Sequence, residues 1–413
     1  MPLLVQKYGG TSVGTPERIR RVAARVAAAR HAGYDVVVVV SAMGDTTDEL
    51  VSLAAEVSPA ARASHPRELD MLLTAGERIT MALAAMAIRD LGLEAISLTG
   101  SQAAIITDEA HGVARIEEVR ATRVREELAA GRVVIVAGFQ GVSRAREVTT
   151  LGRGGSDTTA VALAAALDAD HCDIYTDVDG IFTADPRRVP DARLIGRIGY
   201  QELIELASAG AQVMHPRAVE IGARYGVAIR VRSSFRDDGH EGTLITQQGN
   251  ASMEQLALTG LASSPGFARI ILRGLPATMP AMARVLSTFA AHGVSLDMAG
   301  HADRPDGRRQ LQVSVREADL ERARTVAEAL VEALGGEGVE AVAGLSRVTL
   351  VGSGMTGVPG VYARTFEALV EAGIEVHALS TSAITISLLV DAAAEERTLQ
   401  VLHQAFELVK GGT

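Results

Sequence analysis

The sequence is poor in the features that mark secreted, zinc-binding or membrane proteins. Its single cysteine, Cys172, excludes an intramolecular disulfide and a multi-cysteine zinc site. No apolar run reaches the roughly 18 residues that a bilayer span requires. The first seven residues, MPLLVQK, have no charged region ahead of a long apolar one, as a signal peptide would. We therefore expect a cytoplasmic protein that has no membrane partner.

Positive charge is also scarce. The 413 residues carry 50 acidic and 40 basic side chains, a net charge of −10, which argues against nucleic acid as the main partner. A chain of this length exceeds one ordinary hydrophobic core, so two or three domains are expected.

Lysine is the rarest of the charged residues. Only Lys7 and Lys410 are lysines, and arginine fills the other basic positions. A compact ammonium and a planar guanidinium are not interchangeable beside a phosphate, so a lysine retained against this bias is a candidate for chemistry. Lys410 lies near the chain end, where fraying is common. Lys7 lies between an apolar segment and Gly9-Gly10; the alternative is a surface lysine kept by chance.

Strand and helix patterns alternate through the first 245 residues. β-Branched runs predict strands at 3–5, 35–40, 95–98, 133–137, 172–176 and 227–232, and the stretches between them predict helices at 17–30, 47–57, 67–91, 116–130, 157–167 and 200–210. Buried strands separated by helices are typical of a mostly parallel sheet covered on both faces. Such sheets bind ligands at the carboxyl ends of their strands.

A repeat follows the polar stretch 246–252. Residues 269–298 and 347–376 share an order of strand, Gly/Pro loop, helix, glycine turn and second strand. With further strands at 310–315 and 383–390, each copy predicts a ferredoxin-like module. The pair is either a structural duplication without a ligand or a small-molecule sensor.

Three glycine-rich segments lie where strands are expected to give way to helices, and we expect all three on one sheet. They are 7–12 (KYGGTS), 41–44 (SAMG) and 151–159 (LGRGGSDTT). Glycine lets backbone N–H groups approach phosphate oxygens, and a following helix N-terminus favours negative charge, although glycine also makes ordinary turns. The chain has neither a GxxxxGK[ST] motif nor the protein-kinase set of motifs, so phosphates would be bound by another arrangement.

The motifs VQKYGGTSV, VVSAMG, TAGER, TLGRGGSDTTA and YTDVDGIFTADPR together resemble those of aspartate kinases of the amino-acid kinase family. The resemblance covers the whole chain. It implies an α/β amino-acid kinase (carbamate kinase-like) three-layer fold with a mostly parallel sheet, plus two ferredoxin-like ACT modules. The implied organisation is a catalytic domain at 1–245, a linker and first strand at 246–263, and ACT domains at 264–340 and 341–413.

The resemblance also implies a reaction. ATP would phosphorylate the side-chain carboxylate of L-aspartate to 4-phospho-L-aspartate, the first step towards lysine, threonine and methionine. Lys7 would neutralise charge on the transferring phosphoryl group, and Asp157 would organise Lys7. The substrate would be held by Thr47, Glu77, Arg153 and Ser156. Glu77 can pair with the ammonium and Arg153 can grip a carboxylate. No general base is needed, because a carboxylate nucleophile is already ionised at pH 7.

Nucleotide contacts are implied around the same loops and after 172–176. They are Lys7, Gly9, Gly10, Ser41, Gly44, Gly154, Gly155, Thr176, Asp177, Phe182 and Arg187, with Asp179 near ribose or water. Mg²⁺ is expected as the ATP complex, with no direct protein ligand. This chain has Gln212 where some family members carry a lysine near the nucleotide.

The implied regulation is feedback by an amino acid bound to the ACT pair, with effector contacts at Val361, Tyr362, Val376 and Ser382. The first module lacks the family's D-x-P-G loop, since 275–280 reads LPATMP. The second keeps 357–360 (GVPG) but has Ala383 where an acidic residue is common. We therefore expect weak or absent lysine inhibition, with threonine the better candidate. A homo-oligomer through the ACT domains is expected, and a separate regulatory chain could start at Met253.

Two other functions compete with this interpretation. The chain could phosphorylate glutamate or N-acetylglutamate, although an acetylated substrate lacks the ammonium that Glu77 would bind. It could also be a catalytically silent amino-acid-binding regulator, although such a chain has no need for Lys7, Arg153 and Asp157 together. His111 lies near the expected rim of the site, and we favour a structural role for it.

Overall fold

The computed structural model describes residues 1–211, 213–236, 240–247, 257–353, 355 and 360–408. Gln212, Met253, Lys410 and the stretch 357–359 lie outside them. The chain forms two compact units that interleave in sequence. The first contains Met1–Phe182, Leu194–Ser208 and Gln212–Met253, and the second contains Thr183–Arg193, Ala209–Ala211 and Glu254–Thr413.

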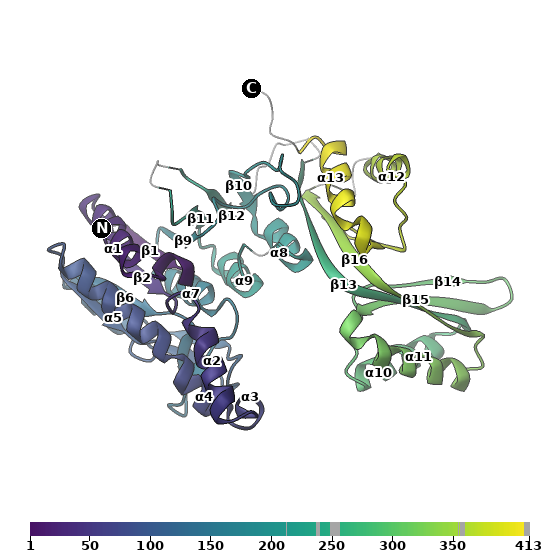
Figure 1. Ribbon diagram of the computed structural model, residues 1–413, viewed down its shortest axis with the longest axis horizontal. Helices are drawn as coiled ribbons and strands as arrows, with labels where there is room; N and C mark the ends of the chain where they lie inside the picture. Colours follow the sequence, from purple (N-terminus) through teal and green to yellow (C-terminus); the bar gives the residue numbers. More distant parts are fainter. Residues whose placement is uncertain (212, 237–239, 248–256, 354, 356–359, 409–413) are drawn as a thin grey trace. The chain divides into compact units, whose positions relative to one another are not determined.

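The first unit is built on an eight-stranded sheet in the order β10-β12-β11-β9-β1-β2-β6-β3 (Figure 1). Its strands are β1 (Leu3–Tyr8), β2 (Asp35–Val40), β3 (Ala95–Leu98), β6 (Val133–Ala137), β9 (His171–Thr176), β10 (Arg197–Gly199), β11 (Ile229–Ser233) and β12 (Thr243–Thr246). All neighbouring pairs are parallel except β11 with β12. The carboxyl ends of β1, β2, β6 and β9 therefore share one edge.

Helices cover both faces of this sheet. The helices of the unit are α1 (Pro16–His31), α2 (Thr46–Val57), α3 (Ala61–Ser64), α4 (Pro66–Leu73), α5 (Ala75–Arg89), α6 (Thr122–Ala129), α7 (Gly155–Leu167), α8 (Tyr200–Ala209) and α9 (Pro216–Tyr225), with a 3₁₀ turn at Gly10–Val13. Apolar residues of α1 and α5 share one buried core with Val36, Val38 and Val40. Alternate strand residues point to opposite faces of the sheet, so both faces need to be covered. Helix α7 packs on β1, β2 and β9 on the face opposite to α1 and α5. The expected three-layer α/β fold is confirmed.

A second, four-stranded sheet was not expected. It has the order β5-β4-β7-β8, from β4 (Ile105–Thr107), β5 (Ile116–Val119), β7 (Gln140–Ser143) and β8 (Val148–Thr150). The predicted helix at 116–130 is therefore wrong in its first part. Residues Ile116–Val119 pair antiparallel with β4, and Ala121 has a φ of 50°, so the helix begins only at Thr122. Pairing with β4 outweighs the helical pattern there.

The second unit contains a six-stranded sheet in the order β14-β15-β13-β16-β18-β17. Its strands are β13 (Ala257–Pro276), β14 (Ala299–Asp303), β15 (Arg308–Arg316), β16 (Gly338–Ser353), β17 (Ala378–Thr381) and β18 (Thr385–Asp391), and its helices are α10 (Met279–Ala291), α11 (Leu320–Ala333), α12 (Val361–Glu371) and α13 (Glu395–Ala405). The second strands of the two repeats, β14 and β17, begin just beyond 298 and 376, where the repeats were expected to end.

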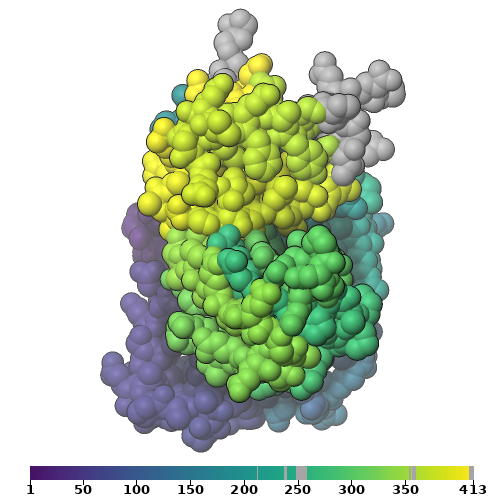
Figure 2. Space-filling view, turned by 90° about the vertical axis from the view of Figure 1, so that its right-hand side faces the viewer, coloured from purple at the N-terminus to yellow at the C-terminus, as the bar shows by residue number. Residues whose placement is uncertain are grey.

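The two modules share their longest strands. β13 has 20 residues and pairs antiparallel with the 16 residues of β16. The carboxyl half of β13 and the amino half of β16 belong to the first module, and the remaining halves complete the second. The modules, green and yellow in Figure 2, thus form one continuous sheet. The pair of ferredoxin-like modules expected from the repeat is confirmed.

Pro66–Arg89, which spans α4 and α5, is the one stretch of helix among the described residues long and apolar enough to cross a membrane. Half of its apolar window is buried within the fold. The same properties are found in core helices, and Thr80, Ala84 and Ile88 are all buried.

Candidate active site

Two of the three glycine-rich segments follow strands of the large sheet. The first follows β1 and the second follows β2, at the shared carboxyl edge. The third follows β8 of the small sheet, so the expectation that all three lie on one sheet was wrong. The third segment nevertheless lies close to the large sheet. Helix α7, which begins within this segment, packs on β1 and β9.

Lys7 and Asp157 form an ion pair at the centre of this edge. The Lys7 Nζ atom lies 2.6 Å from an Asp157 carboxylate oxygen, and the two side chains are only 11% and 12% exposed. Lys7 comes from β1 and Asp157 from the first turn of α7. A charge pair so poorly hydrated is stronger than one on the surface. It holds the ammonium beside two glycine-rich segments.

The first two segments touch each other through glycine backbone. The Gly44 N–H donates to the Gly10 carbonyl at 3.1 Å. A Cβ added at Gly10 would lie 3.0 Å from the carbonyl oxygen of Ala42 and 3.1 Å from that of Gly44. Any side chain at Gly10 would push the two segments apart.

Glu77 lies in the first turn of α5 and is 2% exposed. Its Oε1 atom accepts a hydrogen bond from the Ala42 N–H at 3.0 Å, whereas its buried Oε2 atom has no partner among the described residues. The close approach depends on Gly76, whose added Cβ would lie 2.7 Å from the Ala42 Cβ. Burial raises the pKa of Glu77 from 4.5 to about 7. A positively charged ligand group at Oε2 would restore the ionised form.

The third segment is held tightly at its root. Gly154 has a φ of 68°, and an added Cβ would lie 2.2 Å from the His215 Cβ. Ser156 is buried, and its Oγ atom would lie 2.7 Å from a Cβ added at Gly138 at the end of β6. The Arg217 guanidinium donates to the carbonyls of Leu151 at 2.7 Å and Ala114 at 2.8 Å.

The other predicted substrate residues lie around these segments. Arg153 is exposed and forms no ion pair with any residue in the described part of the chain. Thr47 is half-buried in the first turn of α2, and Ser41 is half-buried just after β2. The structure therefore shows Glu77 next to the second segment and Lys7 next to the third.

The end of β9 joins the first segment. The Gly9 N–H donates to the Tyr175 carbonyl at 3.3 Å, and Thr176 and Asp177 follow directly. The Thr176 hydroxyl donates to the Asp177 carboxylate at 3.1 Å. Phe182 is half-buried and forms a bridge with Leu194.

Arg187 belongs to the second unit. Its guanidinium forms two hydrogen bonds with the Asp185 carboxylate, at 3.0 and 2.8 Å, and these bonds lower the pKa of Asp185.

Of the predicted effector residues, Val361 is buried and Tyr362 is 38% exposed. Val376 is half-buried and Ser382 is exposed. Ser382 is already engaged locally: its hydroxyl accepts from the Ile384 and Thr385 N–H groups at 3.2 and 3.1 Å. These bonds shape the turn between β17 and β18.

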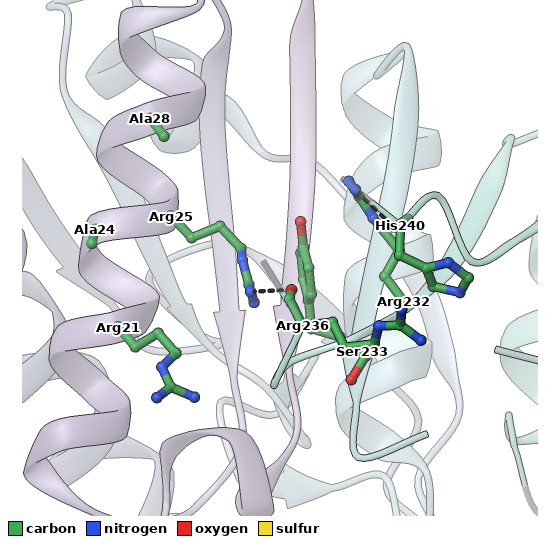
Figure 3. Close-up of a pocket in the computed structure, with 9 residues that line it drawn as sticks. Arg21, Ala24, Arg25, Ala28, Arg232, Ser233, Arg236 and His240 are labelled. Atoms are coloured by element: carbon green, nitrogen blue, oxygen red, sulfur yellow. Dashed lines mark hydrogen bonds between the residues drawn. The ribbon is translucent and has the colours of Figure 1, made fainter. Parts of the chain in front are cut away.

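A separate cavity of about 390 Å³ is lined by residues of α1, β9, β11 and the loop after β11 (Figure 3). Neighbouring strand residues point to opposite faces, so Tyr8 and Tyr175, which stack with ring centroids 4.7 Å apart, lie behind Lys7. Arg25 lies 4.7 Å and Arg232 lies 5.8 Å from the Tyr175 ring centroid.

Arg25 and Arg232 of this cavity have structural partners. Arg25 donates to the carbonyls of Ser234 at 3.3 Å and Arg236 at 3.0 Å, and Arg232 pairs with the buried Asp173 at 3.4 Å. They brace the loop after β11, whose Ser234 hydroxyl lies 2.5 Å from that of Ser12 in the first glycine-rich segment. We assign this cavity no substrate.

Several residues that shape the site are not marked by any pattern in the sequence. Arg217, Ser12 and Ser234 act through backbone or hydroxyl contacts between segments far apart in the chain, and no local pattern marks such contacts. His215 carries a weak signal, since it precedes Pro216 at the start of α9 and accepts from the Arg217 N–H at 3.3 Å.

Comparison with known proteins adds the following. The amino acid kinase family profile matches residues 2–233, and an ACT domain profile matches residues 348–406. An aspartokinase of Mycolicibacterium smegmatis is 49% identical over 99% of this chain and 97% of its own length. An aspartokinase of Bacillus sp. (strain MGA3) is 47% identical over 99% and 98%.

Solved structures agree with this pattern. Aspartokinase III of E. coli in complex with aspartate and ADP (R-state) has a TM-score of 0.78 at 26% identity, and the match covers 98% of this chain and 100% of that chain. The same enzyme in complex with lysine and aspartate (T-state) has a TM-score of 0.72 at 26% identity, over 97% and 99%.

Proposed function

We infer the function of this chain from its membership of the amino acid kinase family, to which it belongs together with the aspartokinases. It is an enzyme that uses ATP to phosphorylate the side-chain carboxylate of L-aspartate. Full-length similarity to aspartokinases at 43–49% identity supports this reaction. The residue roles below are our proposal.

The observation that carries the substrate assignment is the buried Oε2 atom of Glu77, which has no hydrogen-bond partner among the described residues. An unpartnered carboxylate oxygen costs free energy in the apo protein, and an ammonium at this position would recover it. The substrate therefore has a free α-amino group. Arg153, exposed and without an ion pair in the described part of the chain, would bind the α-carboxylate. Thr47 and Ser156 would complete the site.

Phosphoryl transfer would then take place beside Lys7. Its ammonium is fixed by Asp157 at 2.6 Å and stabilises the charge that develops on the transferring group. The N–H groups of Gly9, Gly44 and Gly155 already donate to protein carbonyls, so other backbone N–H groups of these segments, such as that of Gly10, would bind phosphate oxygens. The glycines would let the phosphates approach closely, with Ser41 and Gly154 beside them. The acceptor carboxylate attacks unaided, because it is ionised at neutral pH. Catalysis rests on positioning and electrostatics.

The nucleotide would extend from these segments along Thr176 and Asp177, at the end of the strand that is bonded to Gly9. Phe182 would pack near the base, and Arg187 would reach a phosphate. Mg²⁺ would arrive with ATP and neutralise the triphosphate. The exposed carboxylate of Asp177 suits contact through water with a hydrated Mg²⁺.

The second unit would act as an amino-acid sensor. The continuous sheet joins two ferredoxin-like modules, and Val361, Tyr362, Val376 and Ser382 would line the effector position. We propose threonine as the effector, and a cytoplasmic homo-oligomer that forms through the ACT domains. A separate regulatory chain that starts at Met253 is part of the same proposal.

The decisive experiment measures ADP formation from Mg-ATP with L-aspartate, L-glutamate and N-acetyl-L-glutamate, with hydroxylamine present to trap the acyl phosphate. Turnover and a hydroxamate with aspartate are expected. Turnover only with glutamate or N-acetylglutamate would transfer the reaction to another amino-acid kinase. No turnover with any of the three from folded protein that binds ATP would leave the silent regulator as the explanation, against which the Lys7–Asp157 pair argues.

A further inference from the structure

Asp70 is a buried carboxylate that none of the proposed steps uses. It lies on α4, is 1% exposed, and accepts hydrogen bonds from three residues outside its own helix. His111 Nδ1 lies 2.7 Å from Oδ2, and the Gly112 N–H lies 3.1 and 3.2 Å from the two oxygens. The Thr150 N–H donates at 3.1 Å and its hydroxyl donates at 2.5 Å.

These donors lie next to the start of the third glycine-rich segment, which contains Arg153 and is called the Arg153 segment. Thr150 is the last residue of β8, three residues before Arg153. A Cβ added at Gly152 would lie 3.0 Å from the Gly112 carbonyl oxygen, so the Gly112 backbone lies against the segment itself. The Thr150 carbonyl in turn accepts from the Ala114 N–H at 2.9 Å. Asp70 thus joins the 111–114 loop to the start of the Arg153 segment.

Asp70 is also linked rigidly to Glu77. The two lie seven residues apart across the junction of α4 and α5, a rise of about 10 Å in a regular helix. The junction is fixed on both sides: the Thr74 N–H donates to the Asp70 carbonyl at 3.1 Å, and Gln140 Nε2 donates to the Thr74 carbonyl at 3.3 Å. One short stretch of helix therefore holds Glu77 at one end and the root of the Arg153 segment at the other.

We propose that Asp70 is a positioning residue that sets the ammonium site at Glu77 and the α-carboxylate site at Arg153 relative to each other. The α-carbon of the substrate is thereby held at a fixed reach from Lys7, which the side chain of aspartate matches and that of the longer glutamate exceeds. This inference rests on the proposed function. An ionised carboxylate suits the position, because it accepts from all four donors through its two oxygens. An amide would place its NH₂ group against other donors and leave at least one N–H buried without an acceptor.

The first test is Asp70→Asn. It raises KM for aspartate by about tenfold or more, because bonds to a charged acceptor are lost. It also lowers the ratio of kcat/KM for aspartate to that for glutamate, while KM for ATP changes less than about twofold. Thr150→Val removes only the hydroxyl donor and gives a smaller shift in the same direction. It keeps the test open if Asp70→Asn does not fold.

Asp108→Asn is the matched control. Asp108 accepts from the Ala110 and Arg115 N–H groups in the same loop, at 3.2 and 3.0 Å, and has no bond to Thr150. It should leave the aspartate-to-glutamate ratio unchanged.

His111→Gln, which keeps a donor, should rescue most of the loss seen in His111→Phe.

The outcomes separate the two proposals. No aspartate turnover in the unaltered enzyme removes the proposed function. Normal turnover in the unaltered enzyme, together with an Asp70→Asn variant that folds and keeps its KM for aspartate and its preference over glutamate, overturns the role of Asp70. Equal losses for aspartate, glutamate and ATP would show a merely structural residue, and would overturn it as well.

Discussion

The hydrogen bond from the Ala42 N–H to Glu77 Oε1, 3.0 Å long, fixes one carboxylate oxygen, while the other is buried without a partner in the part of the chain that the structure describes. Helix α5 is thereby joined to the glycine-rich segment after β2. Through this bond, Glu77, which would bind the substrate, directly contacts the segment that would bind phosphate. Burial, and not this bond, raises the pKa of Glu77 to about 7, in the range where enzymes are assayed.

Aspartate use should fall as the pH falls through about 7. Burial raises the pKa of Glu77 to about 7, so below this pH the free enzyme carries a neutral carboxyl that binds ammonium poorly. We expect kcat/KM for aspartate to drop about tenfold per pH unit there. Glu77→Gln should have a low value that no longer depends on pH in this range. An unaltered enzyme with a flat profile between pH 5.5 and 8 would contradict the assignment.

Glu77 should also affect the free energy of unfolding, and here low pH is the favourable condition. Its folded-state pKa is raised above the ordinary 4.5, so the folded protein binds the extra proton and loses stability as the pH rises from about 4.5 to about 7. Glu77→Gln removes this loss. We expect its free energy of unfolding at pH 8 to exceed that of the parent by on the order of 1–3 kcal/mol, with little gain at pH 4. Urea unfolding at both pH values measures the difference.

Lys7→Ala should lower kcat by about 10²-fold or more, by analogy with loss of one preorganised donor that stabilises transition-state charge. Lys7→Arg should not restore activity, because the guanidinium cannot occupy the same position 2.6 Å from Asp157 without displacing a glycine-rich segment. Steady-state kinetics at saturating substrates measure kcat, and circular dichroism checks the fold. Near-normal turnover in Lys7→Ala would remove Lys7 from the mechanism.

Much of the catalytic fold could be predicted from local patterns. The strands at 35–40, 95–98 and 133–137 match β2, β3 and β6 to the residue. For 35–40 and 133–137 the reason is a continuous β-branched run, which permits little else. The small sheet could not be predicted. Its strands have three or four residues each, and β5 exists only because β4 pairs with it.

Some candidate residues of the site could be recognised in the sequence because they are unusual. Lys7 and the glycine-rich segments are unusual in composition, whereas Asp70 and Arg217 are ordinary surface-type residues in the sequence. Their importance comes from burial and from backbone groups far along the chain, such as the Leu151 carbonyl that Arg217 contacts at 2.7 Å. The ion pair of Lys7 with Asp157 spans 150 residues, so only the family resemblance, and no local pattern, pointed to it.

Gly154→Ala should abolish most activity and destabilise the first unit. An added Cβ would lie 2.2 Å from the His215 Cβ and would face a φ of 68°. Gly131→Ala is the matched control, because Gly131 has a φ of 78° but no atom within 4 Å of an added Cβ. It should cost only about 1 kcal/mol and leave kcat unchanged. Thermal unfolding and aspartate turnover distinguish the two. Equal effects would show that backbone conformation, and not the contact with His215, decides the outcome.

Threonine, rather than lysine, should inhibit the enzyme. The first module has no acidic residue in its 275–280 loop, and α10 begins there with Met279, so a second ammonium such as that of lysine has no carboxylate partner in this loop. Threonine needs only one ammonium, one carboxylate and one hydroxyl site. Initial rates with each amino acid alone and with both together test this. Inhibition by submillimolar lysine alone would contradict the prediction, and Tyr362→Ala should weaken the threonine response without a change in the uninhibited rate.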